Sequence, residues 1–136
     1  MDEIESYKIF ISHSNRDTWV ARQIELQIQK LGSFITFLDA KKIQIGDDFE
    51  IVLSDELRSS QEMLILLTPW ALNRRYIWME MGAAWGLGLK MILVLYGLKR
   101  TDLQQDDNIP IIIKRTTVVD INDLDTYFTQ LSKRVY

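Results

Sequence analysis

The amino-acid sequence predicts an α/β fold: a flavodoxin-like three-layer sandwich with a five-stranded parallel sheet. Short apolar runs, typical of strands, alternate along the chain with segments whose apolar residues recur at helical spacing. Such alternation is typical of a parallel sheet that helices cover on both faces. The chain has 136 residues, and five strands in so short a chain favour the flavodoxin-like arrangement of a single domain.

The first half of the chain predicts three strands and two helices. Ser14-Asn-Arg-Asp17 has the S-x-x-D form of a capping box at the start of a helix. That helix buries Val20, Ile24, Ile28 and Leu31, and Gly32 is its expected stop. We expect strands at 7–11, 34–38 and 62–67, a polar loop at 39–48, and a second helix marked by Phe49, Leu53 and Leu57.

The second half predicts two more strands and two more helices. Pro69 suits the first turn of a helix, and the helical pattern continues to about Leu87. We expect strands at 91–96 and 116–121, and between them a polar loop at 98–110 with some local structure. Asn122 can cap a last helix with the apolar face Leu124, Tyr127, Phe128, Leu131 and Val135. This helix ends at the last residue, so we expect residues 1–136 to be a single domain excised from a longer multidomain protein.

The apolar stretch from Met81 to Leu98 has nearly the length of a membrane span. Three glycines and Lys90 divide it, and its second part predicts a buried strand. We therefore expect no membrane association. The acidic N-terminus has no signal-peptide core, and the absence of cysteine fits a reducing cytoplasm, so the predicted location is cytoplasmic.

The composition excludes several kinds of site. The net charge of −3 and the absence of a basic stripe argue against nucleic-acid binding, and Arg74–Arg75 is interpreted as solvated surface. With no cysteine and one histidine, thiolate sites and multi-histidine metal sites are excluded, and no other metal-ligand spacing is present. No glycine-rich phosphate motif occurs between a strand and a helix. We expect no metal and no bound cofactor.

Three groups of residues follow predicted strands or start the next helix, where parallel α/β sheets bind ligands. Ser12-His13-Ser14-Asn15 either binds a ligand or simply caps the first helix. The Asp39–Asp48 segment is either a functional movable loop or an ordinary surface loop. Tyr76 and Glu80 share one helix face. If apolar neighbours partly bury Glu80, its pKa should rise; the alternative is that Glu80 lies on the wet face of its helix.

These motifs together resemble the Toll/interleukin-1 receptor (TIR) domain family. Lys8-Ile-Phe-Ile-Ser-His13 is similar to the opening strand motif, and Phe37-Leu-Asp39 followed by Gly46 to the second box and its loop. Tyr76-x-x-x-Glu80-x-Gly-Ala-Ala-Trp85-Gly is similar to the bacterial helix motif. The resemblance extends from about Tyr7 to Val135. It implies either an NAD-cleaving enzyme of the bacterial type or a non-enzymatic adaptor that works by self-association.

In the enzymatic branch the resemblance makes Glu80 the catalytic residue and NAD⁺ the substrate. The family usually has Trp where Tyr76 stands and a small polar residue where Arg74 stands. The substrate-binding positions that the resemblance implies are Ser12, His13, Ser14, Asp39, Ile43, Gly46 and Tyr76.

A single glutamate suffices for this chemistry. Cleavage of the nicotinamide–ribose bond leaves an oxocarbenium-like ribose, which a carboxylate stabilises. Nicotinamide leaves as a neutral molecule, so no second acid is required. The implied setting is bacterial anti-phage defence, with activation by self-association and a fused or associated sensor domain.

A third interpretation is a related deoxyribosyltransferase, which also uses a glutamate in a similar fold. A phosphoacceptor receiver domain is disfavoured because it needs an acidic cluster after the first strand, where this chain has Ser12 and His13.

Overall fold

A computed structural model describes residues 7–38, 45–46, 48–107, 109, 111, 114 and 116–134. Its centre is a five-stranded sheet in the order β2-β1-β3-β4-β5, in which every neighbouring pair of strands is parallel. The predicted α/β class and parallel sheet are therefore confirmed. The strands are β1 (Tyr7–Ser12), β2 (Phe34–Phe37), β3 (Glu62–Leu67), β4 (Lys90–Leu95) and β5 (Val118–Asp120).

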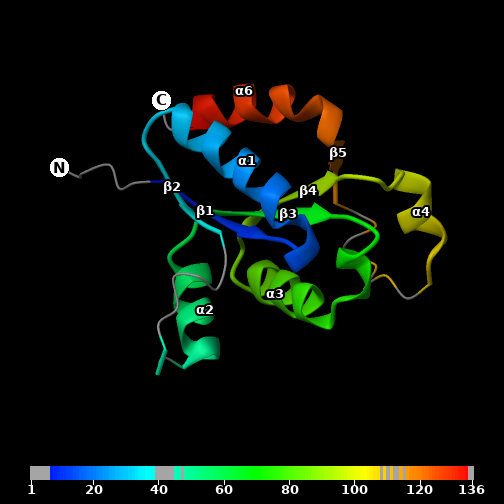
Figure 1. Cartoon of the computed structure of the whole chain (residues 1–136), viewed down its shortest axis with the longest axis horizontal. Coiled ribbons are helices and arrows are strands. Elements are labelled where there is room, and N and C mark those ends of the chain that lie inside the picture. Colours follow the sequence, from blue (N-terminus) through cyan, green and yellow to red (C-terminus); the bar gives the residue numbers. More distant parts are fainter. Residues whose placement is uncertain are drawn as a thin grey trace.

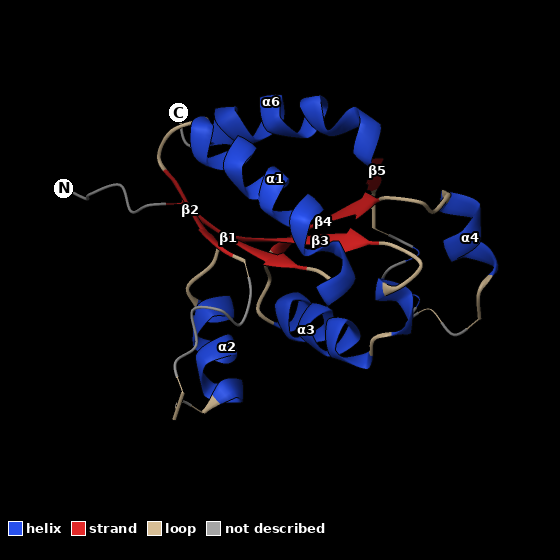
Figure 2. Cartoon of the chain, in the orientation of Figure 1, coloured by secondary structure: helices blue, strands red, loops and turns tan. Residues whose placement is uncertain are grey.

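Helices cover both faces of the sheet. Figure 1 and Figure 2 show α1 and α6 on one face and α2 and α3 on the other, while α4 lies near the β4–β5 edge. The helices are α1 (Thr18–Lys30), α2 (Phe49–Arg58), α3 (Arg75–Gly86), α4 (Arg100–Gln105) and α6 (Leu124–Arg134).

The central strand β3 divides the core into two apolar clusters. All six of its residues are buried, and alternate side chains point to opposite faces, as the pleat of a strand requires. Met63, Ile65 and Leu67 pack with α2, α3 and α4, whereas Leu64 and Leu66 pack with α1 and α6. The continuous apolar run that predicted this strand is thus explained by burial on both faces.

One charged residue of β3 is also buried. Glu62 has no exposed surface, and its carboxylate accepts hydrogen bonds from the hydroxyls of Tyr7 (2.7 Å) and Tyr127 (2.5 Å). Arg134 of α6 supplies the counter-charge, with 3.3 Å between its Nη1 and a carboxylate oxygen of Glu62. Burial and the neighbouring carboxylate raise the pKa of both tyrosines above the ordinary value. Both hydroxyls therefore stay protonated and donate.

Helix starts differ most from the prediction. Ser14 caps a short 3₁₀ helix, η1 (Asn15–Asp17), by accepting from the backbone N–H of Arg16, and α1 begins only after it. The reciprocal half of the predicted capping box is wrong. The Asp17 carboxylate accepts a 2.6 Å hydrogen bond from the Thr68 hydroxyl instead of capping locally.

The predicted helix after Pro69 is divided in two. A 3₁₀ helix, η3 (Ala71–Asn73), comes first, and α3 begins at Arg75 because Arg74 has extended backbone angles. In the predicted 98–110 loop the chain forms α4. The last helix is preceded by another 3₁₀ helix, η4 (Ile121–Asp123), whose cap is Asp120 rather than the predicted Asn122. None of the helices among the described residues is long and apolar enough to cross a membrane.

Candidate active site

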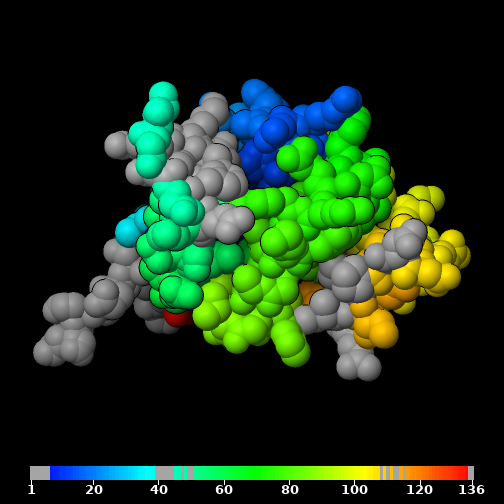
Figure 3. Space-filling view, turned by 90° about the horizontal axis from the view of Figure 1, so that it is seen from below, coloured from blue at the N-terminus to red at the C-terminus, as the bar shows by residue number. Residues whose placement is uncertain are grey.

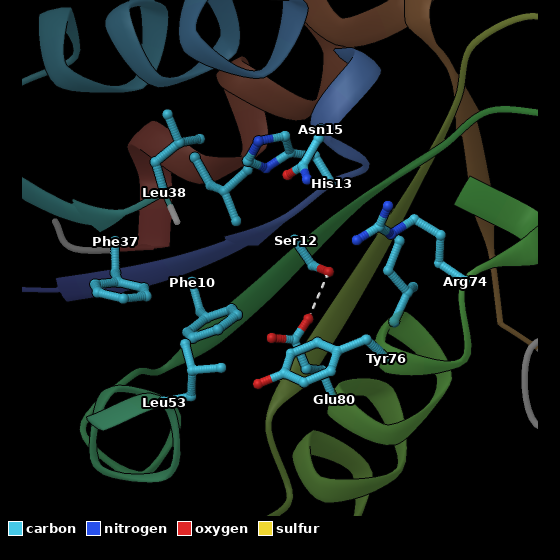
Figure 4. A pocket seen from close by; sticks show the side chains of 12 residues that line it. Phe10, Ser12, His13, Asn15, Phe37, Leu38, Leu53, Arg74, Tyr76 and Glu80 are labelled. Carbon is cyan, nitrogen blue, oxygen red and sulfur yellow. Dashed lines mark hydrogen bonds between the residues drawn. The ribbon is translucent and has the colours of Figure 1, made fainter. Parts of the chain in front are cut away.

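A cavity lies at the carboxyl end of β1, between η1 and the first turns of α3. Its volume is about 110 Å³, and Figure 4 shows the side chains around it. We call it the Glu80 cavity. Phe10 and Phe37 form an apolar wall, with ring centroids 5.2 Å apart. The described lining residues are Phe10, Ile11, Ser12, His13, Asn15, Phe37, Leu38, Leu53, Arg74, Tyr76, Ile77 and Glu80.

Glu80 is held in this cavity by the end of β1. The Ser12 hydroxyl donates a 2.8 Å hydrogen bond to Oε1 of Glu80, drawn as the dashed line in Figure 4. Ser12 is itself buried, so its position is fixed by the strand. Glu80 is half-buried, and the alternative that it lies on an exposed helix face is wrong.

Burial changes the acidity of this carboxyl group. Loss of solvent raises the pKa of Glu80 to about 7, and the Ser12 hydrogen bond opposes part of that rise by stabilising the charged form. The predicted direction is confirmed. A carboxyl with a pKa near neutrality exists in both protonation states at physiological pH, which is typical of groups used in catalysis.

Tyr76 stands one helical turn before Glu80. Figure 4 shows its ring beside the Glu80 carboxylate at the mouth of the cavity. Tyr76, Glu80 and Leu53 also line a groove of about 220 Å³ between α2 and α3, which we call the α2–α3 groove. Glu80 is thus reached from two hollows, one at the strand ends and one along the helices.

The two remaining residues of the strand exit have different surroundings. His13 lines the cavity, and its Nε2 lies 3.3 Å from the Thr18 hydroxyl. Ser14 is buried and is not among the described lining residues; its hydroxyl accepts from Arg16 at 3.2 Å. Its position agrees with the capping alternative.

A side-chain hydrogen bond joins the segments that follow β1 and β3 next to the site. The Thr68 hydroxyl donates to Asp17 and accepts a 3.1 Å hydrogen bond from the backbone N–H of Ala71. This pair fixes η1 and η3 relative to each other and hence the two sides of the cavity. The S-x-x-D pattern marked Asp17 as important, but nothing in the sequence connected it with Thr68.

The predicted loop residues are only partly visible. Asp39 and Ile43 lie outside the described residues. Gly46 is exposed, has φ of +100°, and does not line either hollow. That φ favours glycine, because residues with a Cβ seldom adopt it.

Arg74 is the main lining residue that sequence reasoning missed. The arginine pair was interpreted as solvated surface, yet Arg74 extends from the start of α3 towards Ser12 and His13 (Figure 4). Its place two residues before Tyr76 was the available signal. The sequence indicates Leu53 only as a marker of the second helix and Phe10 only as part of the first strand, because their contribution to the cavity depends on how α2 and β1 meet.

The arrangement suits stabilisation of positive charge. In the described part of the chain, no group of three or more His, Asp or Glu side chains could hold a metal ion. A single carboxylate in apolar surroundings, next to a flat aromatic ring, can stabilise a cationic sugar centre.

Comparison with known proteins identifies the family. The TIR-domain family model matches residues 9–135. A comparison with curated protein sequences gave no match.

Solved structures have the same fold at low sequence identity. A TIR-STING receptor from C. gigas, in complex with 2′,3′-cGAMP, has a TM-score of 0.74 at 19% identity, covering 98% of this chain and 41% of that one. The TIR domains of the activated Roq1 resistosome, which recognises the pathogen effector XopQ, give 0.70 at 15%, covering 96% and 100%. The Clostridium botulinum CMP N-glycosidase BcmB gives 0.58 at 15%, covering 93% and 98%. The likeness to these structures is one of fold, and the family match spans nearly the whole chain. The protein therefore belongs to the TIR domain family.

Proposed function

We propose that this TIR domain is an NAD⁺ glycohydrolase that cleaves the nicotinamide–ribose bond, with Glu80 as the catalytic carboxylate. The observation that supports it most is the half-buried Glu80 carboxylate, which accepts a hydrogen bond from Ser12 in a cavity at the carboxyl end of β1. Such a carboxylate is costly to bury unless it is used or paired with a charge. Among the described residues it has no cationic partner.

In the proposed reaction the C–N bond between ribose and nicotinamide breaks, and its electron pair stays on the nicotinamide nitrogen. Nicotinamide leaves as a neutral molecule, and positive charge develops on the ribose. Ionised Glu80 stabilises that charge and orients the ribose hydroxyls. Water then adds to the ribose and loses a proton to give ADP-ribose; attack by the substrate's own adenine would give a cyclic product instead.

The shape of the site is consistent with binding of the reacting part of NAD⁺. Pockets for whole drug-sized ligands enclose about 300–1,000 Å³, and the Glu80 cavity is smaller at about 110 Å³. It suits the ribose end of the substrate, with the ring of Tyr76 available to stack on a flat base. The rest of the dinucleotide would extend beyond this cavity.

Self-association is the second part of the proposal. Figure 3 shows the surface that α2 and α3 form. Exposed apolar side chains lie in the α2–α3 groove on these helices. Met79 and Leu87 line this groove and are exposed. Trp85 of α3 and Ile51 of α2 are exposed elsewhere on the same two helices. Large exposed apolar residues gathered on one face are typical of interaction surfaces. Assembly through this face would place a neighbouring copy beside Glu80.

We place the activity in bacterial defence against phage, with a sensor domain fused to or associated with this one. Of two proteins with similar fold, one directly recognises the pathogen effector XopQ and the other is a receptor in complex with 2′,3′-cGAMP. That supports a defence setting for this chain, in which sensing triggers NAD⁺ loss.

The deciding experiment is an NAD⁺ cleavage assay at high protein concentration, with nicotinamide and nucleotide products separated by chromatography. The wild type should release nicotinamide, and Glu80→Gln should lower the rate at least a hundredfold, because the stabilising charge is removed. Asp125→Asn, an exposed change on α6, is the matched control and should retain full activity.

A wild type that assembles and leaves NAD⁺ intact would exclude this function. Parallel assays with CMP and with deoxynucleosides then distinguish the remaining possibilities. Cleavage of either would indicate another N-glycosidic enzyme, and cleavage of none would leave a self-association adaptor.

A further inference from the structure

Arg74 places a positive charge on the wall of the Glu80 cavity. It stands between η3 and α3, and Figure 4 shows its guanidinium directed towards Ser12 and His13. Among the described lining residues, Arg74 is the one arginine or lysine and Glu80 the one carboxylate. The cavity therefore has one acidic and one basic group, contributed by the same helix and its cap.

Arg74 is not neutralised by the protein in the described residues. The ion pairs there are Lys8 with Glu56 and Arg134 with Glu62, so neither involves Arg74. Arg74 is the N-cap residue of α3, but its side chain makes no capping hydrogen bond. The residue is exposed to solvent and lines the cavity. A guanidinium next to a reaction site and without an internal counter-ion is free to bind an anion from solution.

The chemistry of the two groups indicates the kind of anion. Glu80 suits a ribose carbon that becomes cationic, and Arg74 suits a phosphate, which a guanidinium binds through two parallel hydrogen bonds. A nucleotide has both features: its ribose joins the reacting carbon to a phosphate on the 5′ oxygen.

We propose that Arg74 binds the 5′-phosphate of the substrate, so that this site selects phosphorylated nucleosides over free nucleosides. The identity of the substrate rests on the proposed cleavage at Glu80. The phosphate contact itself rests on the position of Arg74 and can be tested without cleavage.

The kinetic test compares NAD⁺ with nicotinamide riboside, which has the same scissile bond and leaving group but no phosphate. The wild type should prefer NAD⁺. Arg74→Gln should lower kcat/KM for NAD⁺ by about 10- to 100-fold, since a hydrogen bond to a charged group contributes about 1.5–3 kcal/mol. The value for the riboside should change less than about twofold. Arg74→Lys should recover part of the loss.

Arg75→Gln is the matched control. Arg75 is the next residue, is equally charged and exposed, and does not line the cavity. It should leave both substrates unaffected. Equal losses on both substrates with Arg74→Gln, or no loss on either, would overturn the proposal while leaving Glu80 catalysis intact.

A binding measurement separates this inference from the proposed function. Ribose 5-phosphate is titrated into wild type, Arg74→Gln and Glu80→Gln, followed by ³¹P NMR. We expect Arg74→Gln to weaken binding about tenfold or more and Glu80→Gln to retain it. If the protein leaves NAD⁺ intact but the variants bind ribose 5-phosphate in this pattern, the phosphate site is supported and the proposed glycohydrolase activity is refuted. Identical binding by wild type and Arg74→Gln refutes the phosphate site.

Discussion

The Ser12 hydroxyl and the Glu80 carboxylate oppose each other's effects on acidity. Burial favours the protonated acid, whereas the 2.8 Å hydrogen bond favours the ion. The balance, at a pKa of about 7, leaves roughly half of the molecules with the charge that the proposed reaction needs at neutral pH.

The rate of NAD⁺ cleavage should therefore depend on pH. Because ionised Glu80 is the active form, kcat/KM should rise about tenfold between pH 6 and 8 and level off above that. Ser12→Ala should move the midpoint to higher pH, since the interaction that stabilises the ion is lost. Ser132→Ala, on α6, serves as the control and should keep the wild-type midpoint. Profiles measured from pH 5 to 9 would contradict this if Ser12→Ala moved the midpoint downward.

The Glu80 carboxylate should lower the folding stability of the protein at high pH. A carboxyl whose folded-state pKa is raised from 4.5 to about 7 binds its proton more tightly when folded, so stability falls as pH rises through this window. The full pKa shift corresponds to a loss of about 3 kcal/mol in folding stability. Because Glu80 keeps some solvent contact, we expect a loss of roughly 2 kcal/mol. Urea titrations of Glu80→Gln should show equal stability near pH 4.5 and an advantage approaching that value at pH 8. An advantage that is independent of pH would contradict the assignment.

At the scale of elements, α6 is fastened to the sheet by a buried charge. Tyr127 and Arg134 of α6 both contact Glu62 of β3. A buried carboxylate requires hydrogen-bond donors. Leaving it without one costs far more free energy than the hydrogen bond itself contributes to stability.

Removing one donor should loosen this attachment. Tyr127→Phe keeps the ring and removes the hydroxyl, so the free energy of unfolding should fall by about 2 kcal/mol. Tyr7→Phe should cost less, because Tyr7 is only half-buried and water can replace it. Tyr96→Phe, at an exposed position, is the neutral control. Urea unfolding of the three variants gives the order, and a larger loss for Tyr7 than for Tyr127 would contradict the argument.

The elements also mark how far the sequence could predict the fold. Apolar runs located all five strands. The pattern is clearest for β3, because its burial on both faces requires a continuous apolar run in the local sequence. The starts of the helices were harder to predict from the sequence. Asp17 looks like a local cap, but its partner Thr68 is 51 residues away and belongs to β3's exit. The interruption of the predicted helix at Arg74 likewise depends on η3, which the hydrophobic periodicity of the sequence does not indicate.

For the molecule as a whole, the site depends on contacts that spacing cannot supply. Tyr76 and Glu80 were predictable as neighbours on one helix, but Ser12 lies 68 residues before Glu80. Because β1 and β3 are neighbouring parallel strands, the end of β1, which carries Ser12, lies beside the end of β3, which leads towards α3 and Glu80. The role of Arg74 was missed for the same reason: a charged residue is interpreted as solvated surface until the fold shows a cavity next to it.

Assembly is the prediction that belongs to this scale. Trp85 on α3 is 64% exposed, and Trp85→Glu should weaken self-association, and with it activity at high protein concentration, by placing a charge on the exposed surface of α3. Trp19→Glu is the matched control: Trp19 is 72% exposed but lies on α1, across the sheet. Sedimentation over a range of concentrations should show the effect for Trp85 alone. Equal weakening by both variants would move the interface elsewhere.

The buried Glu62 cluster has a consequence for how the chain folds during synthesis. Its partners come from β1 and from α6, which lie 55 residues before and up to 72 residues after it. Until the ribosome has released α6, the central strand lacks its counter-ion and one of its two tyrosine hydroxyls, and its carboxylate resists enclosure. We expect a nascent chain that ends before Leu124 to remain sensitive to protease, and protection to arise in one late step when α6 docks.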